Sequence, residues 1–188
     1  VVKLAKRGGN VTECRAERIE TADTITAFYN ASDESSRLKK NRHSQIEFLI
    51  SMRYLQEVIP ENSRILDCCA GTGIYAFALA KQHRVVAGDL SEKHIAQMKE
   101  LQKDAPQLEE IRWLDARHMG IFEDESFDVV LCMGALYHLF SYEDRMNAIR
   151  ECVRLCKKGG ILVFAYLNKW GNFYNGMINN LKPMDLLY

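Results

Sequence analysis

A glycine-containing turn is the first feature of the sequence that could do chemistry. Residues 65–70 are mostly apolar, and they lead through Gly71, Thr72 and Gly73 into the apolar run 74–80. This order of strand, glycine turn and helix lets backbone N–H groups approach a ligand closely, and the helix start offers a positive dipole end. The turn suits a polar, nucleotide-like ligand, although the same residues also suit a plain tight turn between a strand and a helix.

Two acids follow at positions where parallel strands are expected to end. Asp89 ends the run from Val85, about 20 residues after the glycines, where a carboxylate can accept hydrogen bonds from both hydroxyls of a ribose. The alternative is that it caps the helix starting at Ser91, a role that Ser91 itself can fill. Asp115 ends the run from Ile111, where an adenine amino group is a natural partner. Its alternative is a solvated carboxylate that caps the turn after it.

The candidate catalytic residues, Tyr137 and His138, follow the apolar run from Phe127 to Met133. Small residues between that run and Tyr137 leave room beside a ligand. Because an imidazole has an unperturbed pKa of about 6.5, His138 can act as a general base near neutral pH. The alternative for both residues is ordinary packing or hydrogen bonding.

Apolar runs rich in branched residues alternate with helical patterns over most of the chain. Strands are expected at 64–69, 85–89, 111–115, 127–133 and 161–167. The alternation predicts an α/β fold: a Rossmann-like, doubly wound sheet of five parallel strands in the order 3-2-1-4-5, with helices on both faces.

The expected helices have apolar stripes at helical spacing. The first runs from Ser44, as N-cap, to Ile59, with Pro60 beyond its end, and the second covers residues 74–81. The stripe of the third is Ile95, Met98 and Leu101; that of the fourth is Met146, Ile149, Val153 and Cys156, with Gly159 and Gly160 ending the helix.

Taken together, these motifs resemble the class I S-adenosylmethionine (SAM)-dependent methyltransferases, above all the small-molecule enzymes of the ubiquinone and menaquinone biosynthesis group. The segments that carry the resemblance are 66–73, Asp89, Asp115, 127–130 and 157–162, within a matching stretch from Ser44 to Leu167. The resemblance implies SAM as cofactor, S-adenosylhomocysteine as product, and methyl transfer to a small-molecule acceptor as the activity.

The resemblance also implies a role for each candidate cofactor-binding residue. Asp67, Ala70, Gly71, Thr72 and Gly73 would surround the methionine part of SAM, Asp89 the ribose, and Leu90, Asp115 and Ala116 the adenine, with Met133 and Gly134 on the opposite wall. Tyr29, Arg37 or Arg42 would close over the methionine carboxylate.

The sequence departs from the family pattern in two places. Cys69 stands where the glycine loop usually begins with another Gly, so its side chain must point away from the ligand or narrow the pocket. After Leu167 the family's last two strands are absent from the pattern, and the first residue is Val. We therefore expect an N-terminal extension or lid (1–43), a SAM-binding domain (44–167), and a C-terminal segment (168–188) that covers the acceptor site or is a truncated remainder.

The composition limits which partners and which cellular compartment are expected. Lys plus Arg equals Asp plus Glu at 25 each, so no strong field favours a nucleic-acid partner or anionic lipid. The longest apolar runs are shorter than the roughly 20 residues of a membrane helix, and the N-terminal residues lack a secretory signal pattern. The sequence thus predicts a soluble, cytoplasmic protein without membrane association, and a homodimer stays open.

The six cysteines form no CxxC pair. Cys68, Cys69 and Cys132 lie in apolar runs and are predicted to be small buried hydrophobes in a reducing compartment, with a redox-active Cys68–Cys69 pair as the alternative. Cys152 and Cys156 could share a helix face, which would be half a zinc site at best. Because the histidines show no ligand spacing either, no metal is expected.

Two other functions fit some of these residues. An NAD-dependent oxidoreductase is the first, because residues 71–76 fit the pattern GxGxxG/A with an acid downstream. Asp67, Asp115 and the Lys-Lys-Gly-Gly lead-in at 157–160 argue against it, as does the lack of a Tyr-x-x-x-Lys pair. A non-catalytic SAM-binding module is the second, favoured by Cys69 and the missing strands. The sequence identifies neither the acceptor nor the methylated atom.

Overall fold

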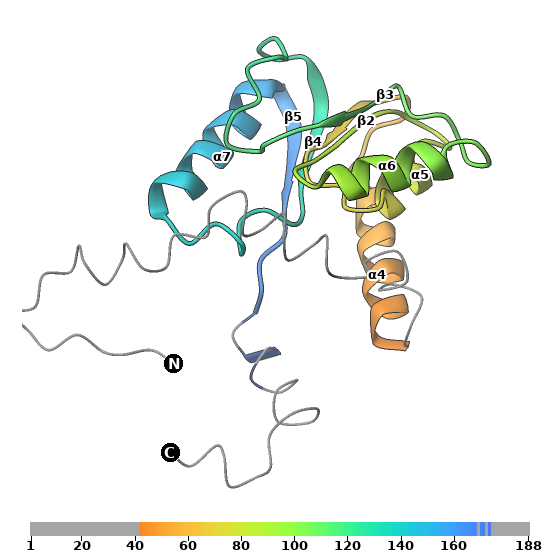
Figure 1. The fold of residues 1–188 in the computed structure, drawn as a ribbon, viewed down its shortest axis with the longest axis horizontal. Helices are drawn as coiled ribbons and strands as arrows, with labels where there is room; N and C mark the ends of the chain where they lie inside the picture. Colours follow the sequence, from red (N-terminus) through yellow and green to blue (C-terminus); the bar gives the residue numbers. More distant parts are fainter. Residues whose placement is uncertain (1–41, 169, 172, 174–188) are drawn as a thin grey trace, which may run out of the picture.

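The protein has a parallel β-sheet at its centre. The computed structural model describes residues 42–168, 170, 171 and 173, and within them five strands lie in the order β3-β2-β1-β4-β5 (Figure 1). This confirms the predicted topology. The strands are β1 (Arg64–Asp67), β2 (Arg84–Asp89), β3 (Glu110–Trp113), β4 (Phe127–Cys132) and β5 (Cys156–Phe164). The helices are α4 (Arg42–Val58), α5 (Ile74–Leu79), α6 (Glu92–Leu101) and α7 (Tyr142–Leu155).

Helices cover both faces of the sheet, as predicted. Successive side chains of one strand point to opposite faces, so along β1 Ile65 enters one apolar cluster and Leu66 the other. The cluster around Leu66 packs against α7, and the cluster around Ile65 packs against α4, α5 and α6. Because the central strands are buried on both faces, their sequences read as continuous apolar runs.

The central strand β1 has parallel neighbours on both sides. Asp67 pairs with Ala87 of β2 and with Leu131 of β4. The chain winds outward in one direction through β2 and β3, and in the other through β4 and β5. The carboxyl end of β1 is therefore the point where the winding reverses, which is where open α/β sheets bind their ligands.

The first described helix differs from its prediction at its start. Helix α4 begins at Arg42, so Ser44 lies within the first turn and is not the N-cap. A serine is tolerated there because the first N–H groups of a helix have no intrahelical acceptor in any case. The other end agrees with the sequence, since the helix stops at Val58, just before Pro60.

Helix α7 buries a different face from the one predicted. Its buried residues are Ala148, Cys152 and Leu155, whereas Val153 is 54% exposed. The helix ends at Leu155, so Cys156 starts β5 and shares no helix face with Cys152. Small residues let the helix approach the sheet closely, and an apolar-stripe pattern gives them little weight. In the same way, Leu101 at the end of α6 is 48% exposed although it continues the predicted stripe.

The two glycines at 159 and 160 lie in β5 and do not end the helix. The pairing of β4 with β5 shifts register there, because Phe127 pairs with Cys156 and Val129 already pairs with Ile161. Gly159 has φ +77°, the left-handed backbone that such an irregularity favours.

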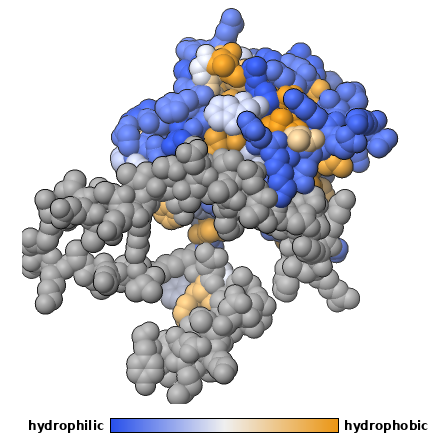
Figure 2. Space-filling view, in the orientation of Figure 1, coloured by the Kyte–Doolittle hydropathy of each residue, from blue (hydrophilic) through white to orange (hydrophobic). Residues whose placement is uncertain are grey.

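No helix in the described part of the chain is long and apolar enough to cross a membrane. The face of the described domain that Figure 2 presents is mostly hydrophilic, with small apolar areas between polar ones. The buried apolar residues of the described part form the two clusters beside the sheet.

The glycine loop allows a matched test of backbone strain and packing. Gly71→Ala and Gly73→Ala both place a side chain at positive φ (+57° and +83°), which costs roughly 1–2 kcal/mol. At Gly73 the new Cβ would also lie 2.9 Å from Phe77 Cε2 and 3.0 Å from Met98 Cγ, whereas at Gly71 nothing lies within 4 Å. Overpacking adds roughly 1–3 kcal/mol, so urea unfolding should show a larger loss for Gly73→Ala. Equal losses would contradict this packing.

Candidate functional site

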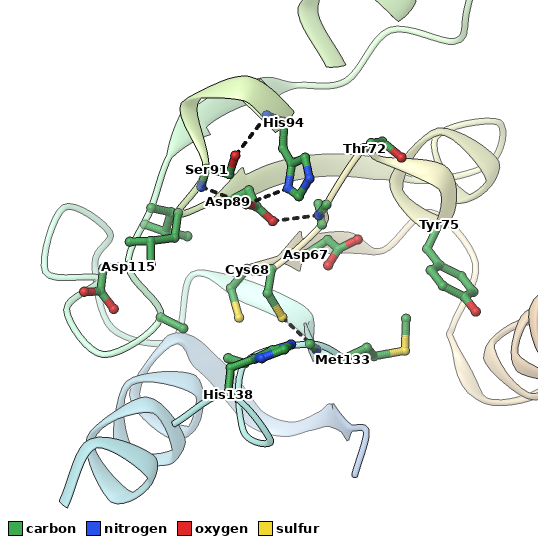
Figure 3. A pocket seen from close by; sticks show the side chains of 18 of the residues that line it. Asp67, Cys68, Thr72, Tyr75, Asp89, Ser91, His94, Asp115, Met133 and His138 are labelled. Atoms are coloured by element: carbon green, nitrogen blue, oxygen red, sulfur yellow. Dashed lines mark hydrogen bonds and ion pairs between the residues drawn. The ribbon is translucent and has the colours of Figure 1, made fainter. Parts of the chain in front are cut away.

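A pocket opens at the carboxyl ends of the central strands. The empty volume, which includes solvent-filled space at its open mouth, is about 1070 Å³. Figure 3 shows Asp89 and His138 on opposite walls, with Asp115 and Tyr75 toward the two ends. The lining residues are Asp67, Cys68, Cys69, Ala70, Gly71, Thr72, Ile74, Tyr75, Asp89, Leu90, Ser91, His94, Leu114, Asp115, Ala116, Met133, Gly134, Ala135, Tyr137 and His138.

The loop between β1 and α5 forms one wall of the pocket. The Ala70 N–H donates to Gly88 O (2.9 Å), and the Gly73 N–H donates to Ala70 O (2.9 Å), so the loop is tied to β2 and turns tightly. Gly71 has φ +57°, and a Cβ built on it would meet no atom within 4 Å. The loop thus presents bare backbone to open space, as a site for close approach of a ligand requires.

Asp89, the last residue of β2, is held by three donors. Its Oδ2 accepts from the Gly71 N–H at 2.7 Å, and its Oδ1 accepts from the Ser91 N–H at 2.9 Å and from His94 Nδ1 at 3.0 Å. The side chain is 12% exposed, so its orientation is fixed in the pocket wall. Ser91 is the N-cap of α6, and its hydroxyl accepts from the His94 N–H at 3.4 Å. The helix therefore has its own cap, and Oδ2 keeps acceptor capacity for a ligand.

Asp67, at the end of β1, is a buried carboxyl that faces the same pocket. It is 2% exposed. Burial raises its pKa well above the usual range, the nearby charges of Cys69 and Asp89 raise it further, and the backbone N–H of Cys69 opposes the shift. A buried carboxyl beside a second acid is a favourable place for a positively charged group of a ligand, because an opposite charge favours the ionised form.

Asp115 lies in the pocket wall but is already bonded within the protein. Its Oδ1 accepts from the backbone N–H of Arg117 at 2.9 Å, and its Oδ2 lies 2.7 Å from Arg117 Nη2. Burial raises the pKa of Asp115, but the hydrogen bonds and charge of Arg117 outweigh it, so the pKa is lowered. The carboxylate does cap the turn that follows, as one sequence interpretation held, but its side chain is only 13% exposed.

The opposite wall comes from β4 and the segment after it. The Tyr137 and His138 rings lie side by side, with centroids 4.6 Å apart. The Gly134 N–H donates to Cys69 Sγ at 3.1 Å, which joins this wall to the loop after β1. The Cys69 side chain is thus turned toward β4 while it lines the pocket, which is how the chain accommodates a larger residue in the glycine loop.

Most of the residues singled out in the sequence come together here. Twelve of them line this one pocket: Asp67, Ala70, Gly71, Thr72, Asp89, Leu90, Asp115, Ala116, Met133, Gly134, Tyr137 and His138. Gly73 is not in the lining, because its space is bounded by Phe77 and Met98. Tyr29, Arg37 and the side chain of Arg42 lie outside the described residues.

Sequence reasoning missed Tyr75 and His94. Tyr75 lies in the first turn of α5 and His94 in the first turn of α6, and both helices start at the pocket. Their positions in the sequence, shortly after the ends of β1 and β2, are the signal that could have identified them. Tyr75 also contacts Phe48 of α4, with ring centroids 5.3 Å apart, which brings α4 next to the pocket.

Comparisons with known proteins show which family the sequence matches. Residues 66–164 match the family described as a methyltransferase domain. A ubiquinone biosynthesis O-methyltransferase of Paracidovorax citrulli is 32% identical over 112 residues, 58% of this chain and 45% of the relative. The chain spans about half the length of the curated relatives it matches.

Solved structures share the fold. The N-methyltransferase NodS of Bradyrhizobium japonicum, solved with S-adenosyl-L-homocysteine, is similar with a TM-score of 0.64 and 22% identity, over 77% of this chain and 72% of NodS. The [4+2]-cyclase SpnF is similar with a TM-score of 0.56 and 23% identity, over 65% of this chain and 46% of SpnF. Since a cyclase has this fold too, the fold alone does not define the reaction.

Asp67 should make the stability of the protein depend on pH. A carboxyl with a raised folded-state pKa contributes stability that is fully present below its unfolded pKa of about 3.9 and is lost as the pH rises through the folded pKa. Asp67→Asn should therefore melt above the wild type at pH 8, with a gain that shrinks toward pH 5.

Asp128→Asn is the matched control for this experiment. The Lys157 hydrogen bond lowers the pKa of Asp128, so that carboxylate contributes stability above its unfolded pKa, and its loss should lower the melting temperature at pH 8. Thermal melts of the two variants at pH 5 and pH 8 should differ in sign at the higher pH. A lower melting temperature for Asp67→Asn at both values would contradict a neutral, buried carboxyl.

Proposed function

Because the chain belongs to the methyltransferase domain family, we propose that it transfers the methyl group of SAM to a small-molecule acceptor. The observation that carries the proposal is the hydrogen bond from the Gly71 N–H to Asp89, which brings the glycine loop and the acid of β2 into one pocket. The S-adenosyl-L-homocysteine bound by NodS, a protein of the same fold, supports SAM as the cofactor.

The residues present fit such a cofactor. Asp89 Oδ2 faces the pocket with acceptor capacity for ribose hydroxyls, and the bare backbone at Gly71 leaves space for close approach. Leu90, Asp115 and Ala116 would form the adenine end, and Met133 with Gly134 the opposite wall. When bound, SAM supplies a methyl group that its sulfonium makes electrophilic. The protein then has mainly to position the acceptor in line with that carbon.

Asp67 would hold the positively charged amino-acid end of the cofactor. The buried carboxyl ionises most readily when a cation lies beside it, because an opposite charge favours the charged form. Ligand binding would therefore lower the pKa of Asp67. Ala70 and Thr72, in the same loop, would surround that end of the ligand.

On the opposite wall, His138 would act as the general base. A hydroxyl acceptor must lose its proton during the reaction, and an imidazole nitrogen of His138 can take it. The adjacent Tyr137 ring would orient the imidazole and close the acceptor side. The O-methyltransferase name of the curated relatives supports a hydroxyl acceptor, which is the class to test first.

The cysteines bear on the cellular compartment of the proposed enzyme. All five cysteines among the described residues are free, which supports a reducing, cytoplasmic compartment. We expect no nucleic-acid or membrane partner, and we leave a homodimer open. Residues 1–43 would form a lid over the cofactor, with Tyr29 near its carboxylate.

The function is tested by binding and turnover together. Isothermal titration with SAM, S-adenosylhomocysteine and NAD⁺ should show binding of the first two only. Incubation with methyl-labelled SAM and a panel of phenols, amines and thiols should then transfer label to one class. Binding of SAM with no turnover on any class would support a non-catalytic SAM-binding module, and binding of NAD⁺ in place of SAM would overturn the proposal.

Removing the Asp89 carboxylate should weaken SAM binding. A hydrogen bond to a charged group is worth about 1.5–3 kcal/mol, so Asp89→Ala should raise the Kd for SAM by roughly 10-fold to 150-fold. Asp104→Ala, which removes an exposed aspartate after α6, is the matched control and should leave the Kd unchanged. Isothermal titration decides, and an unchanged Kd for Asp89→Ala would remove Asp89 from the site.

Removing the proposed base should separate binding from turnover. His138→Gln should lower kcat on a hydroxyl acceptor by about 10²–10⁴, the usual contribution of a general base, and leave the Kd for SAM unchanged. It should also abolish the limb of the pH–rate profile that reports ionisation of the imidazole. A variant that keeps the wild-type kcat and pH profile would show that His138 only packs against Tyr137.

A further inference from the structure

Four cysteine thiols gather beneath the pocket, and we refer to Cys68, Cys69, Cys132 and Cys152 as the thiol cluster. The Sγ atoms of Cys68, Cys69 and Cys132 all lie within 4.8 Å of one another. Cys152 of α7 belongs to the same buried apolar cluster as Cys68 and Cys132. Cys68, Cys132 and Cys152 are buried, whereas Cys69 is half-buried in the pocket wall. Figure 3 shows the Cys68 side chain directed from β1 toward the wall that carries Met133 and His138.

The fold, and not the local sequence, brings the thiols together. Asp67 pairs with Leu131 in the register of β1 and β4, which places Cys68 opposite Cys132 one step further along. The Cys68 N–H still donates to Leu131 O at 3.0 Å, so the strands stay adjacent at this point. Helix α7 packs on the same face and adds Cys152. Because the thiols come from three separate parts of the fold, they form no spacing motif in the sequence. The sequence therefore predicted no metal.

We propose that the thiol cluster binds a thiophilic metal ion of the zinc class, with Cys68, Cys69 and Cys132 as its three sulfur ligands. A Zn–S bond of about 2.3 Å in a tetrahedral site places the sulfur atoms about 3.8 Å apart. The three sulfur–sulfur separations, none above 4.8 Å, need contract by at most about 1 Å, which small side-chain rotations supply. Three sulfur donors select soft ions over Mg²⁺ or Ca²⁺.

The surroundings of the thiol cluster favour a metal over plain packing. The Gly134 N–H donates to Cys69 Sγ at 3.1 Å, and a backbone N–H of this kind stabilises the charge of a ligating thiolate. Because Cys68 and Cys69 line the open pocket, an ion reaches their sulfur atoms without opening the core.

The proposed metal site shares Cys68 and Cys69 with the pocket lining, but metal binding by thiols needs no methyl transfer, so the inference does not rest on the proposed function. Its test is direct titration of the reduced, metal-free chain with Cd²⁺, followed by the ultraviolet charge-transfer band of cadmium–thiolate bonds, with Zn²⁺ then displacing Cd²⁺. We expect one ion per chain. A thermal melt should show the loaded protein melting higher than the metal-free protein, because the ion binds the folded chain.

Variants distinguish the thiol cluster from the other cysteines. Cys14→Ser/Cys156→Ser removes the two cysteines outside the thiol cluster and should bind one Cd²⁺ with unchanged affinity. Cys69→Ser in that background should bind Cd²⁺ at least about 10-fold more weakly, since one of the three sulfur ligands is lost. Cys69 is half-buried, so this variant should fold, and circular dichroism of the metal-free protein checks it.

The proposal has two outcomes that overturn it. The first is the absence of a cadmium–thiolate band at equimolar Cd²⁺ in the reduced, folded chain. The second is binding by Cys69→Ser as tight as that of its background. Either result would return the thiols to the role of small buried side chains. Metal binding without SAM binding would leave this proposal intact and count only against the proposed function.

Discussion

The hydrogen bond between the Gly71 N–H and Asp89 Oδ2, 2.7 Å long, is the interaction on which the site depends. It closes the loop after β1 onto the tip of β2, and it requires the left-handed backbone at Gly71. Ser91 and His94 hold the other carboxylate oxygen, so the acid cannot turn away from the pocket. The pocket is thus organised before any ligand arrives, which lowers the entropy that binding must overcome.

Two of the three acids in the pocket show how position decides chemistry. Asp89 accepts hydrogen bonds from three donors in the pocket wall, whereas burial raises the pKa of Asp67 well above its usual range. A buried carboxyl of this kind reduces the stability of the empty protein at neutral pH. A positively charged ligand beside Asp67, such as the proposed sulfonium-bearing cofactor, would recover that stability. The same electrostatic effect would thus lower the stability of the ligand-free protein and favour a positively charged ligand.

The sequence predicted those parts of the molecule that depend on local pattern and on the geometry of parallel sheets. Five apolar runs give five strands, and acids at the ends of two runs, Asp89 and Asp115, meet in one pocket because parallel strands end at the same edge. The sequence did not predict the Arg117 partner of Asp115 or the buried face of α7. The first depends on the exact turn after β3, and the second on small residues such as Ala148, which pattern reasoning undervalues.

Cys69 connects the pocket to the thiol cluster, and this has a thermodynamic consequence. A glycine at this position would leave the Gly134 N–H without its sulfur acceptor, so the cysteine is what bonds the loop after β1 to the wall after β4. One Sγ atom then belongs both to the pocket lining and to the proposed metal site. Any ion that moves this sulfur changes the shape of the pocket. An ion in the thiol cluster that moves this sulfur would therefore change the affinity of the pocket for its ligand. By thermodynamic linkage, that ligand would change the affinity of the thiol cluster for the ion by the same factor.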